Sequence, residues 1–435
     1  MARRLRDGTL GDLREFDALL AASLIWFLGQ FVRYVFPPLF ETLRGQYGVS
    51  NTTLGLLFSL LMVGYAGMQF PSGAIADRIG TVRVITVGVL LVATAGWILA
   101  LTDAFLLLGI AMLLLGIGSG FHKTVAIALL SIAYPDRTGR TLGTLDMFGQ
   151  FGGVAAPAVV AFMLSRALDW RLLFVGVGVG GVALGIVFYF RTNRRLRAVG
   201  VDPNGGTTTT KTTAEDGSEK SGLGAYLTAF RTRRFLGIVV VAVTFSFTWT
   251  GITAFLPLYL TSEIGLRSTF AGVLYSSIFA VSLIQPFAGG VSDRIGHLPV
   301  MAGTLGVAGV ALGTLIAVPP VLVVVAAVPM IGIGYHGCRP ARDAYLVEAI
   351  PESVAGGTLG LVRTLMMGMG ATAPALVGFL SDIAGFQLAF GVLLAALLGS
   401  IVILLVLLMT TDETPIPGKP EDATATATDR SDRNG

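Results

Sequence analysis

The chain has 435 residues, a formal net charge of +4, 54% hydrophobic residues and only 13% charged residues. Its mean hydropathy of +0.77 excludes an ordinary soluble domain, in which about a quarter of the residues are charged. A single cysteine, Cys338, excludes an internal disulfide, and the sequence around it lacks the Cys-x-x-Cys spacing of a metal site.

Apolar segments long enough to cross roughly 30 Å of hydrocarbon, at about 20 residues each, recur along the chain. Such segments predict helices, because a bilayer-spanning helix satisfies its own backbone hydrogen bonds. We therefore predict an all-α membrane protein with twelve transmembrane helices, at residues 17–40, 52–76, 82–102, 105–133, 141–164, 171–190, 235–260, 269–291, 298–318, 321–349, 356–380 and 386–410.

A polar segment divides the twelve predicted helices into six and six. We predict an N-terminal six-helix half at 1–190, a cytoplasmic linker at 191–234, a C-terminal six-helix half at 235–410 and a disordered cytoplasmic tail at 411–435. Arginine is concentrated in the loops on the linker's side of the membrane, which predicts a multi-pass protein of the cell (plasma) membrane with both termini in the cytoplasm. The same bias explains the positive net charge without a nucleic-acid partner.

One loop motif occurs twice. Gly73-Ala-Ile-Ala-Asp77-Arg78-Ile-Gly80 follows the second predicted helix, and Gly289-Gly-Val-Ser-Asp293-Arg294-Ile-Gly296 follows the eighth, at an offset of 293 − 77 = 216 residues. Because this offset contains six helices, the halves should share one topology and be related by an axis along the membrane normal. The same offset, or one residue more, relates Gln69 to Gln285, Gly116 to Gly332, Gly118 to Gly334, Pro135 to Pro351, Pro157 to Pro374 and Phe162 to Phe379.

On these motifs the chain resembles the major facilitator superfamily, over its whole length from the first helix to the twelfth. The loop from Gly73 to Arg83 is similar to the signature between the superfamily's second and third spans. The resemblance implies two pseudo-symmetric six-helix bundles, secondary transport of a small solute by alternating access, coupling to H⁺ or a counter-solute, and a monomeric functional unit. The chain departs from the pattern at Met112, where members often have arginine, and at His297 and Pro299, which no basic pair follows.

The repeated loop suggests a gate. Asp77 is placed to cap the start of a neighbouring helix, while Arg78 and Arg83 stay at the cytoplasmic face. We interpret these residues, with Asp293 and Arg294 of the second copy, as a latch that is closed when the cytoplasmic mouth is closed. The alternative is that the arginines only anchor the orientation of the chain.

Asp146 and Arg363 extend this gate hypothesis. They lie near the cytoplasmic ends of the fifth and eleventh helices and are related by the repeat. In the superfamily's fold the fifth span is expected beside the eighth and the eleventh beside the second, so we expect Asp146 to pair with Arg294 and Arg363 with Asp77. We favour this gating role over a substrate role.

Charged residues within the spans are costly and tend to face a cavity or each other. Arg33 lies too deep in the first helix to reach the surface, and its position is similar to that of an anion-binding arginine in the superfamily's organic-anion and organophosphate branches. Lys123 and Arg339, related by the offset of 216, are expected to face each other, forming with Arg33 a site for a carboxylate or phosphate. Alternatively, Lys123 or Arg339 pairs internally with Asp343 or Glu348.

Arg342 and His122 complete the candidates for substrate binding. His122 is also a candidate for carrying a coupling proton, because histidine titrates near neutral pH; the alternative is a histidine packed against a neighbouring helix. Asp343 and Glu348 are further proton-coupling candidates. We predict no metal and no cofactor.

The sequence disfavours other functions. It has no His-Glu-x-x-His motif and no Gly-Lys-Ser/Thr phosphate loop, so neither an enzyme nor an ATP-driven pump is predicted. The twofold repeat favours alternating access over a channel. We expect transport of an organic anion bearing carboxylate or phosphate, and the alternative is proton-coupled efflux of multiple drugs or hydrophobic compounds.

Overall fold

The computed structural model describes residues 16–201, 232–350 and 355–410. Every regular element in these ranges is helical. The N-terminal half contains α2 (Asp17–Tyr34), α3 (Phe36–Tyr47), α4 (Asn51–Ile79), α5 (Thr81–Leu101), α6 (Phe105–Gly120), α7 (Lys123–Ala133), η1 (Pro135–Arg137), α8 (Thr138–Ser165) and α9 (Arg171–Ala198). The C-terminal half contains α11 (Arg233–Ser262), α12 (Ser268–Ala280), η3 (Val281–Ile284), α13 (Gln285–Ile295), α14 (His297–Ile316), α15 (Val321–Glu348) and α16 (Ala355–Thr410).

The number of spanning segments agrees with the sequence. Ten helices in the described residues are long and apolar enough to cross a membrane, or eleven when the bent pair α2–α3 counts as one span. α16 is interrupted by the non-helical Gly385, and counting its two parts separately gives twelve. The predicted all-α fold is confirmed. α9 continues beyond residue 190 to Ala198, while residues 202–231 of the predicted linker and the tail from residue 411 lie outside the described ranges.

The internal repeat is reproduced in the helix packing. A Cβ atom on Gly118 would lie 2.6 Å from the carbonyl oxygen of Gly88 on α5, and a Cβ atom on Gly334 would lie 2.6 Å from that of Thr304 on α14. Since 334 − 118 and 304 − 88 both equal 216, the same close crossing occurs in each half. Only glycine permits backbones to approach so closely.

The two copies of the loop motif also share one backbone conformation. Gly80 has φ 91° and ψ 145°, and Gly296 has φ 94° and ψ 157°. The N–H group of each donates to the residue four positions earlier, at 2.9 Å and 3.0 Å. A positive φ favours glycine, which explains why glycine occupies the same position in both copies of the loop.

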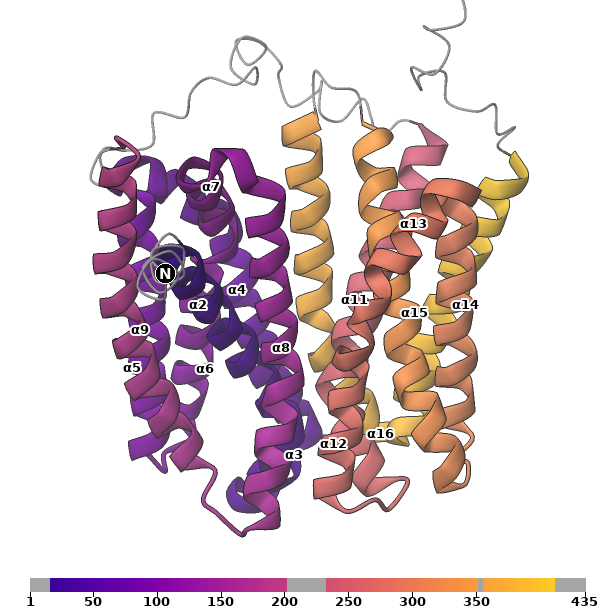
Figure 1. Cartoon of the computed structure of the whole chain (residues 1–435). Helices are drawn as coiled ribbons and strands as arrows, with labels where there is room; N and C mark the ends of the chain where they lie inside the picture. The colour runs from indigo at the N-terminus through magenta and orange to yellow at the C-terminus, as the bar shows by residue number, and fades with distance from the viewer. Residues whose placement is uncertain (1–15, 202–231, 351–354, 411–435) are drawn as a thin grey trace, which may run out of the picture.

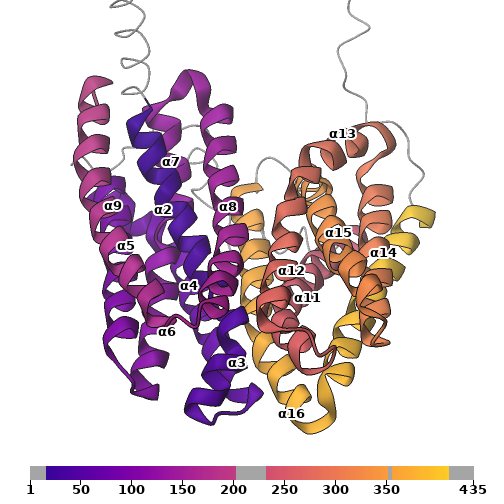
Figure 2. The ribbon, with the colours of Figure 1, turned by 60° about the horizontal axis from the view of Figure 1, so that its bottom comes forward.

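The helices form two bundles that stand side by side (Figure 1). We call the end at which α9 ends at Ala198 and α11 begins at Arg233 the linker end. The opposite end, at which α3 ends at Tyr47 and α12 begins at Ser268, is the far end. Figure 2 shows α3 reaching toward the second bundle at the far end.

The two halves are joined at the far end by α4 and α16. The Asp382 carboxylate accepts hydrogen bonds from the backbone N–H of Asn51, at 3.1 Å, and from that of Thr52, at 2.7 Å. These N–H groups belong to the first turn of α4, where the helix dipole attracts a negative charge. Where α4 and α16 cross, a Cβ atom on Gly55 would overlap the carbonyl group of Pro374.

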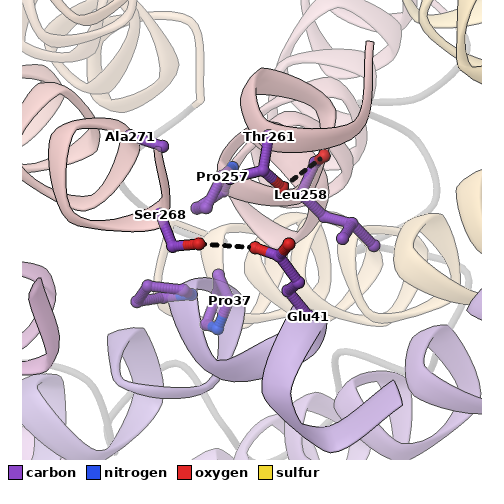
Figure 3. Close-up of a pocket in the computed structure, with 8 residues that line it drawn as sticks. Pro37, Glu41, Pro257, Leu258, Thr261, Ser268 and Ala271 are labelled. Atoms are coloured by element: carbon purple, nitrogen blue, oxygen red, sulfur yellow. Dashed lines mark hydrogen bonds between the residues drawn. The ribbon is translucent and has the colours of Figure 1, made fainter. Parts of the chain in front are cut away.

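Further contacts close the far end. Ser268 of α12 donates to the Glu41 carboxylate of α3 at 2.7 Å, across a narrow crevice that Pro37 and Pro257 also line (Figure 3). Deeper in the interface, a Cβ atom on Gly272 of α12 would lie 3.0 Å from the side chain of Ala161 on α8.

The linker end differs from the far end. None of the ion pairs among the described residues joins the two halves, and the side-chain hydrogen bonds that do join them all lie near the far end. Among the described residues, the halves are therefore joined by polar contacts at the far end, and no comparable contacts join them at the linker end.

Candidate functional site

Arg33 lies in the last turn of α2, where the chain bends by 41° into α3. Pro37 and Pro38 lack the N–H groups that would continue the helix, and this loss causes the break. The Arg33 side chain is only 9% exposed, and its Cζ atom lies 3.7 Å from the centroid of the Tyr65 ring on α4. Its Nε and Nη2 atoms are buried and lack a hydrogen-bond partner in the described part of the chain. Arg33 is thus a buried cation without a counter-ion there.

Aromatic side chains of both halves meet next to Arg33. Tyr34 contacts Phe279 of α12, with ring centroids 4.3 Å apart, and Phe279 contacts Trp249 of α11 at 5.9 Å. Since 249 − 33 = 216, Trp249 holds the position in its half that Arg33 holds in the other. We call Tyr34, Trp249 and Phe279 the aromatic floor. Contacts between the two halves extend from these residues to the far end.

A histidine extends the aromatic floor. His336 of α15 lies 5.3 Å from Trp249, measured between ring centroids, and its Nδ1 atom lies 3.3 Å from Nε2 of Gln285. Its Nε2 atom is buried and has no partner in the described ranges. His336 and Phe279 were not predicted from the sequence, although the repeat, which aligns Arg33 with Trp249, indicates this region.

Lys123 forms an ion pair with Asp146 of α8, inside the N-terminal half. The alternative in which Lys123 pairs with Asp343 or Glu348 is not found in this conformation, and the pair expected between Asp146 and Arg294 is not formed. The reason is that Lys123 and Asp146 lie in the same bundle, whereas the other three residues belong to the opposite bundle, which is not sealed to it at the linker end.

The cations of α15 differ in their partners. Arg342 donates from Nε and Nη2 to one carboxylate oxygen of Asp343, at 2.9 Å and 2.7 Å. Arg339, about one turn earlier, forms no salt bridge with any described residue. Its electrostatic neighbours are Arg342 and Asp343 of the same helix and, from the other half, Tyr34 and Asp146. Arg339 is the second cation of this region without a salt bridge to a described carboxylate, and it belongs to the other half.

The proton-coupling candidates lie in different surroundings. His122 is 3% exposed and stacks on Trp26, with ring centroids 5.7 Å apart, which matches the packed alternative. Glu348 lies at the linker end and contacts His297 at 3.1 Å, whereas Asp343 adjoins Arg342. Their roles in coupling stay predictions. No group of three histidine, cysteine or acidic residues suited to a metal ion occurs in the described ranges.

The other gate candidates are all exposed side chains in the part of the bundle nearer the linker end. The pair expected between Asp77 and Arg363 is not formed among the described residues. Such pairs need the two halves to meet at this end, so the gating role stays a prediction. The residues concerned are Asp77, Arg78, Arg83, Asp293, Arg294 and Arg363.

Two membrane-spanning six-helix bundles related by a parallel repeat, with a polar site at their interface, define a secondary transporter. The chain belongs to the Major Facilitator Superfamily, whose family model matches residues 22–284 and 269–431. The predicted superfamily is thereby confirmed, and the protein is a multi-pass membrane transporter.

Named relatives are transporters of small molecules. The chain is 23% identical over 370 residues to the cis,cis-muconate transport protein of Acinetobacter baylyi, covering 82% of this chain and 85% of that protein. It is 25% identical over 375 residues to the gentisate transporter of Corynebacterium glutamicum, covering 83% and 81%. A solved bacterial homolog of the human lysosomal transporter Spinster, in an inward-facing and occupied conformation, superposes with a TM-score of 0.73 at 17% identity, covering 90% of this chain and 96% of that one. The last likeness confirms the fold.

Proposed function

We propose that the protein is a secondary active transporter of an organic anion, which binds at Arg33 and crosses the membrane by alternating access. The observation that carries the proposal is the buried guanidinium of Arg33, whose Nε and Nη2 atoms have no partner in the described chain. Leaving a charge buried and unpaired is costly, and an anionic solute repays that cost when it binds.

The chemistry of arginine supports a carboxylate as the bound group. The Nε and Nη2 atoms of a guanidinium point in the same direction and match the two oxygens of a carboxylate. Muconate and gentisate, for which two relatives are named, are both organic carboxylates. Stacking on Tyr65 holds the guanidinium plane in place.

We place the protein in the plasma membrane, with the linker end and both termini in the cytoplasm. The excess of arginine in the loops on the linker's side supports this orientation. The conformation described here is then open to the cytoplasm and closed to the outside. In the conformation that is closed to the cytoplasm, Asp146 would pair with Arg294 instead of Lys123, and Asp77 would pair with Arg363. A proton or counter-solute gradient would drive the cycle.

Transport into proteoliposomes tests the proposal, with radiolabelled muconate and gentisate as probes. Arg33→Ala should lower the affinity by about 2 to 5 kcal/mol, which is the usual cost of removing one partner of a buried charge pair. Arg33→Lys should keep part of the activity, because it keeps the charge but not the two-pronged geometry.

The matched control is Arg166→Gln, which changes an exposed arginine at the far end and should transport like the wild type. Full transport of both anions by Arg33→Ala would refute the proposal. Proton-driven movement of drug-like cations by the same variant would favour the efflux alternative.

A further inference from the structure

The charges between the two halves do not balance. Lys123 pairs with Asp146, and Arg342 pairs with Asp343, which leaves Arg33 and Arg339 unpaired among the described residues. Four cations against two carboxylates give this region a net charge of +2. The charged side chains counted are Arg33, Lys123, Asp146, Arg339, Arg342 and Asp343.

The two unpaired cations are placed for one ligand with two charges. Arg33 belongs to α2 of the N-terminal half and Arg339 to α15 of the C-terminal half. Tyr34, which follows Arg33 directly in the chain, belongs to the aromatic floor. Arg339 lies about one helical turn after His336, which contacts Trp249 of the same floor. Both arginines therefore lie next to the aromatic floor. A ligand held by both would connect the two halves.

Arg342 shows how such a guanidinium binds a carboxylate in this protein. Its Nε and Nη2 atoms both donate to Asp343. The same two atoms of Arg33 are the ones that lack a partner. An incoming carboxylate would therefore complete at Arg33 the arrangement that Arg342 already has.

We propose that the transported solute is a dicarboxylate, with one carboxylate bound by Arg33 and the other by Arg339. This inference rests on the proposed function and specifies its substrate class. Two carboxylates neutralise the net charge of +2, and the aromatic floor of Tyr34, Trp249 and Phe279 offers a flat surface to the carbon skeleton between them. A monocarboxylate would leave one guanidinium without a partner.

Calorimetric titration of the purified full-length protein tests this inference with matched ligands. Muconate and sorbate share a six-carbon diene skeleton, but muconate has two carboxylates and sorbate has one. Terephthalate and benzoate likewise share a benzene ring and have two carboxylates and one carboxylate, respectively. The wild type should bind the dicarboxylate of each pair at least about tenfold more tightly, because a second guanidinium then has a charged partner.

Variants of Arg339 separate the two carboxylate sites. Arg339→Gln should lower dicarboxylate affinity to that of the monocarboxylate while leaving monocarboxylate binding unchanged. Arg339→Lys should retain part of the dicarboxylate preference, and it serves as the test variant if Arg339→Gln does not fold in a melting experiment. Arg33→Gln should weaken both ligands, and the exposed-arginine control Arg166→Gln should keep the wild-type preference.

The outcomes distinguish this inference from the proposed function. Equal affinities within both pairs would overturn the dicarboxylate inference and leave an anion transporter. Tighter binding of phenyl phosphate than of either dicarboxylate would replace it with a phosphomonoester. Failure of the wild type to bind any of these anions would refute the proposed function itself.

Discussion

The guanidinium of Arg33 is buried, and burial of a charge is unfavourable unless an ion pair compensates for the lost hydration. No described carboxylate forms such a pair with Arg33. Arg342 is equally buried but forms two hydrogen bonds with Asp343. The two residues can therefore be compared as a buried cation without a partner among the described residues and a buried cation paired with a neighbouring carboxylate.

We expect Arg33→Met to raise the free energy of unfolding of the empty protein by about 1 to 4 kcal/mol, because an apolar side chain replaces an unpaired ion. Transport should be lost at the same time, as is usual when a strained functional residue is relieved. Thermal unfolding without ligand measures the effect. Arg342→Met, which breaks an existing pair, should lower the melting temperature, and a lower melting temperature for Arg33→Met as well would mean that Arg33 already has a partner.

Single residues show where the sequence was informative. The depth of Arg33 could be predicted, because the apolar residues on both sides of it fix its place in the span. The partner of Lys123 could not be predicted. The helix is broken between α6 and α7, at Phe121 and His122, and this break changes the direction in which Lys123 points. Residue spacing carries no information on such a rotation.

At the level of helices, the crossing of α4 and α16 depends on glycine. Gly55 of α4 faces the backbone at Pro374, and Gly378 of α16 faces the backbone at Asn51. Small residues in membrane helices indicated close packing from the sequence alone. They could not indicate which helices meet, because the partners at this crossing belong to different halves and depend on the conformation.

Gly55→Ala should destabilise the protein by about 1 to 3 kcal/mol, since the added methyl group would force the two backbones apart. Gly67→Ala, about three helical turns along the same helix, is the matched control, because no atom lies within 4 Å of its added Cβ. Alanine favours the helix there, so the control should be neutral or slightly stabilising. Melting curves of the two variants compare them directly, and equal curves would contradict the close crossing.

At the scale of the whole molecule, the described contacts join the two halves at the far end, and we expect the halves to move as two bodies about these contacts. The repeat and the twelve spans could be read from the sequence because they depend on composition and register. The lack of contacts between the described residues of the two halves at the linker end could not be predicted, since one sequence must support both conformations of a transporter and the contacts at each end change between them.

Spin-label distances can follow this motion in a Cys338→Ala background. Labels at Gly143 of α8 and Gly290 of α13, both exposed, report on the linker end, while labels at Gly45 and Arg267 report on the far end. A bound solute should shorten the first distance and lengthen the second, because it favours the states in which the halves close around it.

Labels at Gly73 and Gly143 lie within one half and form the control, whose distance should stay constant. An unchanged distance between Gly143 and Gly290 in saturating solute would argue against a rocking motion. Equal changes in the control pair would show that the half itself deforms.

The two unpaired guanidiniums also act when no solute is present. If the proposed site is correct, closing the linker end around an empty site brings two unpaired cations into a less hydrated space, where like charges repel each other. We then expect slow return of the unloaded carrier and fast return with a solute of either origin. Such a carrier would exchange solutes between the two compartments more readily than it would accumulate a solute in one of them.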